Sequence, residues 1–105
     1  MSATGQDRPA VVRNAAAQRF ELTVDGHVGV LEYHLVSDRL LLQHTDVPAA
    51  LQGHGYANDL ARAGLDYAAR EQLRVVPQCP FVRAYLKRHP ELLPLVDERW
   101  RKEVE

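Results

Sequence analysis

The feature that most constrains the fold is a glycine-containing stretch between an apolar run and an amphipathic segment. Residues 40–42 are three leucines that favour a buried strand, and a helical pattern covers about residues 56–71. Between them, Pro48 ends the strand, while Gly53 and Gly55 allow positive φ and close approach of a ligand to the main chain. The unpaired N–H groups of a helix's first turn carry partial positive charge. The sequence therefore predicts an anion-binding loop between strand and helix.

The two sides of the predicted helix differ in chemistry. Asp59, Arg62, Asp66 and Arg70 fall within one arc and alternate in sign at spacings of three and four, which favours a solvated face. The opposite side is apolar and mostly small: Ala57, Leu60, Ala61, Gly64, Leu65 and Ala68. Small side chains let a helix pack closely against a sheet. Close packing is a sufficient reason for Gly64, which costs about 1 kcal/mol of helix propensity.

Alternating apolar residues and turn signals predict a meander of strands before this helix. Asp25-Gly26 is a type I′ hairpin signal, and the connection through the helix makes the last strand parallel to its predecessor. The expected strands cover about residues 10–13, 19–24, 27–36, 39–47 and 73–76. Pro80 opens a second helix that ends near His89, and a short final helix is expected within residues 92–104. The predicted class is α+β, with a mixed, mostly antiparallel sheet, a long helix after the glycine loop and a second helix after the last strand.

Composition narrows the class of protein. The 105 residues suffice for one domain, which we expect over residues 10–105 after a mobile tail at residues 1–9. Thirteen basic and fourteen acidic residues argue against a general nucleic-acid or membrane-surface binder. No apolar run is long enough to cross a bilayer, and the N-terminus lacks the apolar stretch of a signal peptide. A single cysteine suits a reducing compartment, so we expect a cytoplasmic protein.

Three phrases of the sequence together resemble a known family. They are Leu-x-His-Thr-x-Val-Pro at residues 42–48, Gln-Gly-His-Gly-Tyr-Ala at residues 52–57, and Cys-Pro-Phe-x-x-x-Tyr at residues 79–85. In this order, and with His89-Pro90-Glu91 following, they are similar to the small, single-domain members of the GNAT acetyltransferases. The resemblance covers about residues 11–92. It implies the cofactor half of the GNAT fold and binding of acetyl-CoA.

The resemblance also implies which residues bind the cofactor. Backbone N–H groups from Gly53 through Ala57 would receive the CoA pyrophosphate, and the strand end at residues 44–47 would pair with the pantetheine arm. The side chains of Gln52 and Asn58 could add neutral hydrogen bonds. The full set is Thr45, Asp46, Val47, Gln52, Gly53, His54, Gly55, Tyr56, Ala57 and Asn58. A plain helix-entry turn is the alternative explanation for the glycines.

Three residues, His44, Cys79 and Tyr85, are the main candidates for the chemistry. An amine with a pKa near 10.4 is only about 0.1% neutral at pH 7.4, so acetyl transfer needs a base. His44 is the first candidate base and Glu32 a weaker one, with a structural histidine as the alternative. Tyr85 falls near the position of the family's tyrosine acid, although core packing would also explain it. Cys79 precedes a helix N-terminus, a position that favours a reactive thiolate, although lone cysteines are mostly buried hydrophobes.

Other features leave the function open between three hypotheses. No histidine shows metal-ligand spacing, so no metal is predicted. Full-length GNAT enzymes carry two helices after the first strand, where this chain has only residues 14–18. The leading hypothesis is an acetyl-CoA-dependent N-acetyltransferase acting on an amine, either a small molecule or a protein. The alternatives are a non-catalytic CoA-binding or protein-interaction module and a phosphate-binding module for another nucleotide. The sequence does not determine the acceptor or the oligomeric state.

Overall fold

A five-stranded sheet is the central element of the computed structural model, which describes residues 8–105. Its strands follow one another in sequence order: β1 (Val12–Asn14), β2 (Arg19–Val24), β3 (His27–Val36), β4 (Arg39–Asp46) and β5 (Arg74–Pro77). The first four pair antiparallel, and β5 pairs parallel to β4. The predicted mixed, mostly antiparallel sheet is confirmed. Of the predicted mobile tail, residues 1–7 lie outside the described residues.

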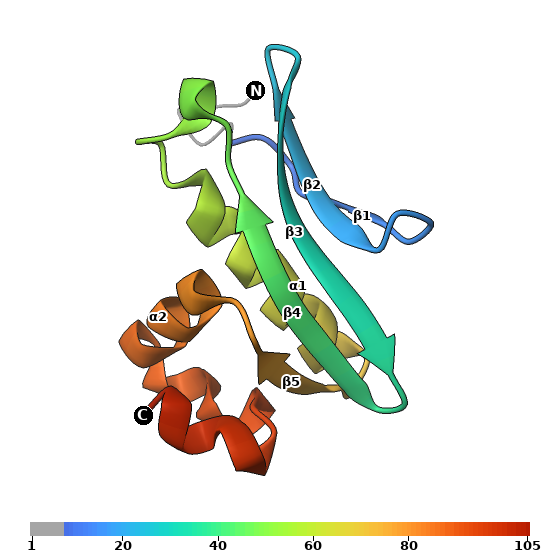
Figure 1. The fold of residues 1–105 in the computed structure, drawn as a ribbon, viewed down its shortest axis with the longest axis vertical. Coiled ribbons are helices and arrows are strands. Elements are labelled where there is room, and N and C mark those ends of the chain that lie inside the picture. The colour runs from blue at the N-terminus through green and yellow to red at the C-terminus, as the bar shows by residue number, and fades with distance from the viewer. Residues whose placement is uncertain (1–7) are drawn as a thin grey trace.

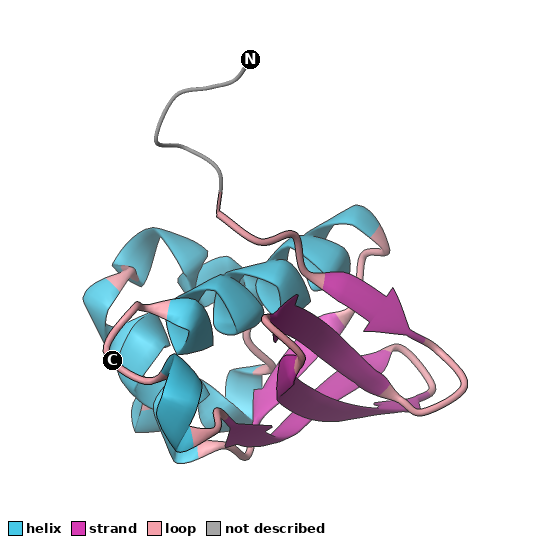
Figure 2. Cartoon of the chain, turned by 90° about the horizontal axis from the view of Figure 1, so that it is seen from above, coloured by secondary structure: helices cyan, strands magenta, loops and turns pink. Residues whose placement is uncertain are grey.

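Two α-helices cover one face of this sheet (Figures 1 and 2). Helix α1 (Tyr56–Arg70) contacts β2, β3, β4 and β5, and helix α2 (Pro80–Arg88) packs against α1, β4 and β5. Both helices begin at the predicted positions. Gly64 explains how closely α1 approaches the sheet, because a Cβ at this position would lie only 3.2 Å from Cδ2 of Leu31.

The end of the chain differs from the expected single helix. It forms two 3-10 helices, η2 (Pro90–Leu95) and η3 (Glu98–Glu103). Pro94 cannot donate a helical hydrogen bond, and Val96 adopts an extended conformation that bridges to Val75 of β5. The Asp97 amide then donates to the Val75 carbonyl at 2.9 Å. Pairing with the edge strand therefore interrupts the helix.

The core lies between the sheet and the helices. Strand residues alternate between the two faces, so Leu22, Leu31, Tyr33, Leu40 and Leu42 are buried beneath α1 and α2. We call the opposite side the open face of the sheet. It carries the exposed side chains of Thr23, Val28, Glu32, His34 and His44.

Among residues 8–105, no helix combines the length and the apolar character that crossing a membrane requires.

Candidate functional site

Strand β4 extends beyond the end of its neighbour β5, so the sheet is open at this point. The two strands pair from Arg39 with Arg74 up to Leu42 with Pro77, and β4 then continues to Asp46. The Cys79 amide donates to the Leu42 carbonyl at 2.9 Å, after which the chain enters α2 and leaves the sheet. Figure 1 shows β4 running on beyond β5 at this point. In the described residues, the last part of β4 therefore has a strand partner only on the β3 side.

A β-bulge in β4 decides which way the side chains of this free segment point. Tyr33 pairs with Leu42 but Glu32 pairs with His44, so Gln43 is an extra residue in the ladder. The bulge reverses the alternation that Leu40 and Leu42 begin. His44 consequently lies on the open face, directly opposite Glu32.

The bulge turns Thr45 toward the helices, where it contacts Cys79. Thr45 pairs with the core residue Leu31, and its Oγ1 lies 3.2 Å from the Sγ of Cys79. Cys79 is the N-cap residue of α2 and is only 3% exposed. His44 and Thr45 thus point to opposite faces of β4, and Cys79 lies on the side of Thr45.

The glycine loop enters α1 with the predicted positive φ angles. Gly53 has φ 86°, and Gly55, the N-cap of α1, has φ 76°. A short 3-10 helix, η1 (Ala49–Leu51), precedes the loop and buries Leu51. A Cβ at Gly53 would meet no atom within 4 Å, so the backbone there faces open space.

The loop leaves a series of amide donors unpaired. The first amides of α1 that find a backbone acceptor are those of Asn58 and Asp59, which both donate to the Gly55 carbonyl. Within residues 8–105, the five preceding N–H groups have no hydrogen-bond acceptor: Gly53, His54, Gly55, Tyr56 and Ala57. Adjacent free N–H groups at a helix N-terminus are suited to an anionic ligand. The donor set therefore fits a phosphate group.

A cavity of about 220 Å³ adjoins these amides. Its lining contains seven of the predicted cofactor residues: Val47, Gln52, Gly53, Gly55, Tyr56, Ala57 and Asn58. Leu51 and Phe81 complete the lining, and neither was predicted. Phe81 belongs to α2, so this helix supplies an apolar wall opposite the glycine loop.

The remaining predicted cofactor residues, His54, Thr45 and Asp46, do not line this cavity. The His54 ring stacks on Tyr56 with centroids 5.3 Å apart and borders a different cavity, next to Val24 and His27. Thr45 points toward Cys79, and Asp46 pairs with Val30 on the open side of the sheet. Thr45 and Asp46 thus extend the site along β4.

Two of the predicted polar side chains are occupied with holding the loop in place. Gln52 Nε2 donates to the Val47 carbonyl at 3.0 Å. Arg88 Nη2, from the end of α2, donates to Oδ1 of Asn58 at 3.1 Å. These contacts connect the loop to β4 and to α2, and Arg88 brings a positive charge to the helix N-terminus.

A second guanidinium reaches the loop from the N-terminal segment. Nη2 of Arg8 donates to the His54 carbonyl at 2.7 Å and to Asp59 Oδ2 at 2.7 Å, and Nε donates to the same oxygen at 2.9 Å. The hydrogen bond to Asp59 raises the pKa of Arg8 above its ordinary value. Sequence reasoning missed Arg8 because no local pattern connects it with a loop 46 residues away.

The third candidate for the chemistry, Tyr85, lies elsewhere. It is buried, its ring stacks on His89 with centroids 4.2 Å apart, and it borders a separate cavity next to Leu65 and Leu92. Phe81, one helical turn earlier on α2, is the residue that reaches the glycine-loop cavity.

The fold and the loop define an α+β domain with a loop of unpaired amides between β4 and α1. Residues 19–95 match the sequence model of the GCN5-related N-acetyl-transferase family. The chain therefore belongs to this family, as the three sequence phrases indicated. The family transfers acetyl groups to amine acceptors and generally binds acetyl-CoA, which makes this domain a predicted acyltransferase.

Curated relatives support the same assignment. Protein NATD1 of Mus musculus is 37% identical over 102 residues, covering 93% of this chain and 91% of the relative. Protein NATD1 of Homo sapiens is 42% identical over 71 residues, covering 67% of this chain and 61% of the relative. The Danio rerio protein of that name is 30% identical over 86 residues, covering 79% of this chain and 78% of the relative.

Proposed function

We propose that this chain is an acetyl-CoA-dependent N-acetyltransferase that transfers the acetyl group directly to an amine. The observation that carries the proposal is the row of unpaired loop amides from Gly53 to Ala57 beside a cavity and the free end of β4. Loop amides of this kind bind phosphate, and a free strand edge can pair with an amide-containing chain. Acetyl-CoA has both parts, and it would supply the acetyl group in activated form.

In this proposal, the loop and the strand end hold the cofactor. The amides of residues 53–57 bind the diphosphate, and the main chain of residues 45–47 aligns the pantetheine arm. Phe81 and Leu51 supply the apolar walls of the cavity. Gln52 and Asn58 keep the loop in its binding conformation through their bonds to Val47 and Arg88.

The chain must also remove a proton from the acceptor. We assign this role to His44, which is exposed on the open face and is therefore accessible to an amine that approaches from solvent. Its cross-strand neighbour Glu32 supplies a carboxylate that can attract a cationic amine. We assign Tyr85 to packing, because its ring is stacked on His89 and borders a separate cavity.

Titration calorimetry with CoA tests the cofactor assignment. Saturable binding of CoA, with a higher affinity than that of ATP for the same site, supports the proposal. Absence of binding at millimolar CoA overturns it, and stronger competition by ATP favours a site for another nucleotide. A cytoplasmic location is a separate prediction, which cell fractionation would test.

One observation favours a second candidate, a non-catalytic CoA-binding module. β1 and β2 are joined by a turn of a few residues, whereas full-length GNAT enzymes carry two helices after the first strand. The acceptor side is consequently open. Acetyl-CoA turnover measured against small amines, polyamines and lysine peptides separates the candidates, because a module without turnover would bind CoA and release no thiol.

A further inference from the structure

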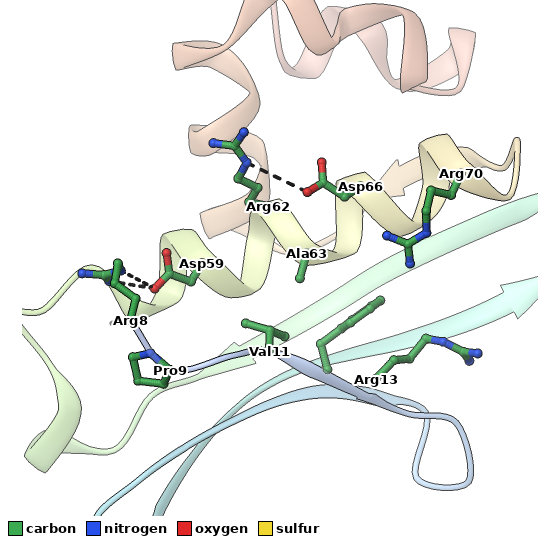
Figure 3. A pocket seen from close by; sticks show the side chains of 10 residues that line it. Arg8, Pro9, Val11, Arg13, Asp59, Arg62, Ala63, Asp66 and Arg70 are labelled. Carbon is green, nitrogen blue, oxygen red and sulfur yellow. Dashed lines mark hydrogen bonds and ion pairs between the residues drawn. The ribbon is translucent and has the colours of Figure 1, made fainter. Parts of the chain in front are cut away.

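Arg8 lies against the glycine loop although it precedes the sheet in sequence. It is at one end of a cavity of about 380 Å³ between the N-terminal segment and α1, which Figure 3 shows with Asp59 and Arg62. The dashed lines mark the contacts of Arg8 with Asp59 and the ion pair between Arg62 and Asp66. Cζ of Arg8 also lies 5.3 Å from the centroid of the Tyr56 ring, a distance suited to a cation–π contact.

The contacts of Arg8 fix its guanidinium without using all of its donors. A guanidinium has five N–H groups. Nε and Nη2 bond to Asp59 and to the His54 carbonyl, whereas the two N–H groups of Nη1 have no acceptor in residues 8–105. Asp59 therefore orients a cation that still has donors to offer.

The guanidinium is also close to the loop backbone. A Cβ built at Gly55 would lie 3.5 Å from Nη2 of Arg8, an ordinary van der Waals contact, so the guanidinium lies directly beside this glycine. The unpaired amides of the loop lie on either side of this glycine. Arg8 thus places a guanidinium beside the same loop whose amides are unpaired.

We infer that Arg8 is a phosphate-binding residue of the cofactor site, oriented by Asp59. The inference rests on the proposed function and adds a residue from outside the glycine loop. Arginine binds phosphate strongly because its planar N–H groups match two phosphate oxygens. Arg8 replaces part of the water around the phosphates, and its charge offsets the carboxylate of Asp59, which would otherwise repel an anion.

Calorimetry of variants tests this inference with CoA and with pantetheine, which carries no phosphate, as probes. Arg8→Ala is expected to weaken CoA binding about tenfold or more, as loss of a charge-assisted hydrogen bond implies. Arg8→Lys is expected to restore part of the affinity. Pantetheine affinity is expected to stay unchanged in both variants. Arg62→Ala is the matched control, because it removes an arginine from α1 that pairs with Asp66 instead.

The outcomes separate this inference from the proposed function. If the unsubstituted protein does not bind CoA, the proposed function fails. If it binds CoA and Arg8→Ala binds equally or more tightly, only the role of Arg8 is overturned. Thermal unfolding of each variant shows whether the fold is retained, and a smaller salt dependence of CoA affinity in Arg8→Ala would support a contact with phosphate.

Discussion

The hydroxyl of Thr45 and the thiol of Cys79 meet at 3.2 Å, although the residues are 34 positions apart. The contact joins the end of β4 to the N-cap of α2, on the helix-covered side of the sheet. His44, the residue before Thr45, faces the open side. A base at His44 and a nucleophile at Cys79 would therefore act from opposite sides of the same strand.

This separation predicts different effects of two substitutions on acetyl transfer. His44→Ala is expected to lower kcat by about 10² to 10⁴, the usual contribution of general acid–base catalysis. Cys79→Ala is expected to keep most of the activity, because its thiol is buried and does not contact His44. Release of CoA thiol during turnover measures both. Complete loss of activity in Cys79→Ala, with retained CoA binding, would instead indicate an acetyl-cysteine route.

Gly55→Val is expected to abolish CoA binding while the fold is retained. The residue has φ 76°, a conformation that costs a β-branched residue about 1–3 kcal/mol, and relief of this strain would move the amides of the loop. Gly26→Val is a matched control, since Gly26 has φ 81° in the β2–β3 hairpin and a Cβ there would meet no atom within 4 Å. Equal CoA affinity in both variants would contradict the assignment of the loop.

Gly64→Leu is expected to lower the free energy of unfolding by about 1–3 kcal/mol, even though leucine favours helices. A Cβ at Gly64 would already lie 3.2 Å from Leu31 Cδ2 and 3.3 Å from Leu42 Cδ2. Urea denaturation measures the loss. Ala69→Leu, at an exposed position of the same helix, is expected to leave stability nearly unchanged.

Asp97→Ala is expected to cost about 1–3 kcal/mol of stability. Asp97 is only 4% exposed, accepts from the Arg99 amide at 3.0 Å and pairs with Nε of Arg39 at 3.2 Å. Its loss would remove the ion pair that connects the start of η3 to Arg39 of β4. Asp66→Ala, which breaks an exposed pair with Arg62, is expected to change stability by less than about 1 kcal/mol. Similar losses in the two variants would contradict this explanation.

Glu21 is expected to make stability fall in acid. Hydrogen bonds from Arg19 and Asn14 hold the pKa of Glu21 below its ordinary value in the folded protein. The stabilisation is therefore present above the unfolded pKa, about 4.3, and is lost as pH falls through the folded value. Urea denaturation between pH 7 and pH 3 should show a smaller decline in Glu21→Gln. An identical decline in the two proteins would mean that these hydrogen bonds do not contribute to the pH dependence of stability.

The sequence determined the strands, the two α-helices and the position of the loop. Alternation located β2 and β3, Asp25-Gly26 located their hairpin with φ values of 51° and 81°, and the helical pattern located α1. These features depend on side chains a few residues apart, and so they can be read along the chain. The glycines at positions 53 and 55 likewise indicated positive φ, because few other residues adopt it without strain.

Only the tertiary structure decided which side chains surround that loop. The extra residue Gln43 in β4 reverses the faces on which His44 and Thr45 lie. This β-bulge depends on the register in which β4 pairs with β3. Arg8 reaches His54 and Phe81 reaches the cavity through contacts between distant segments. The spacing of residues along the chain does not predict such contacts, because they form only when the sheet and α1 pack around a common core.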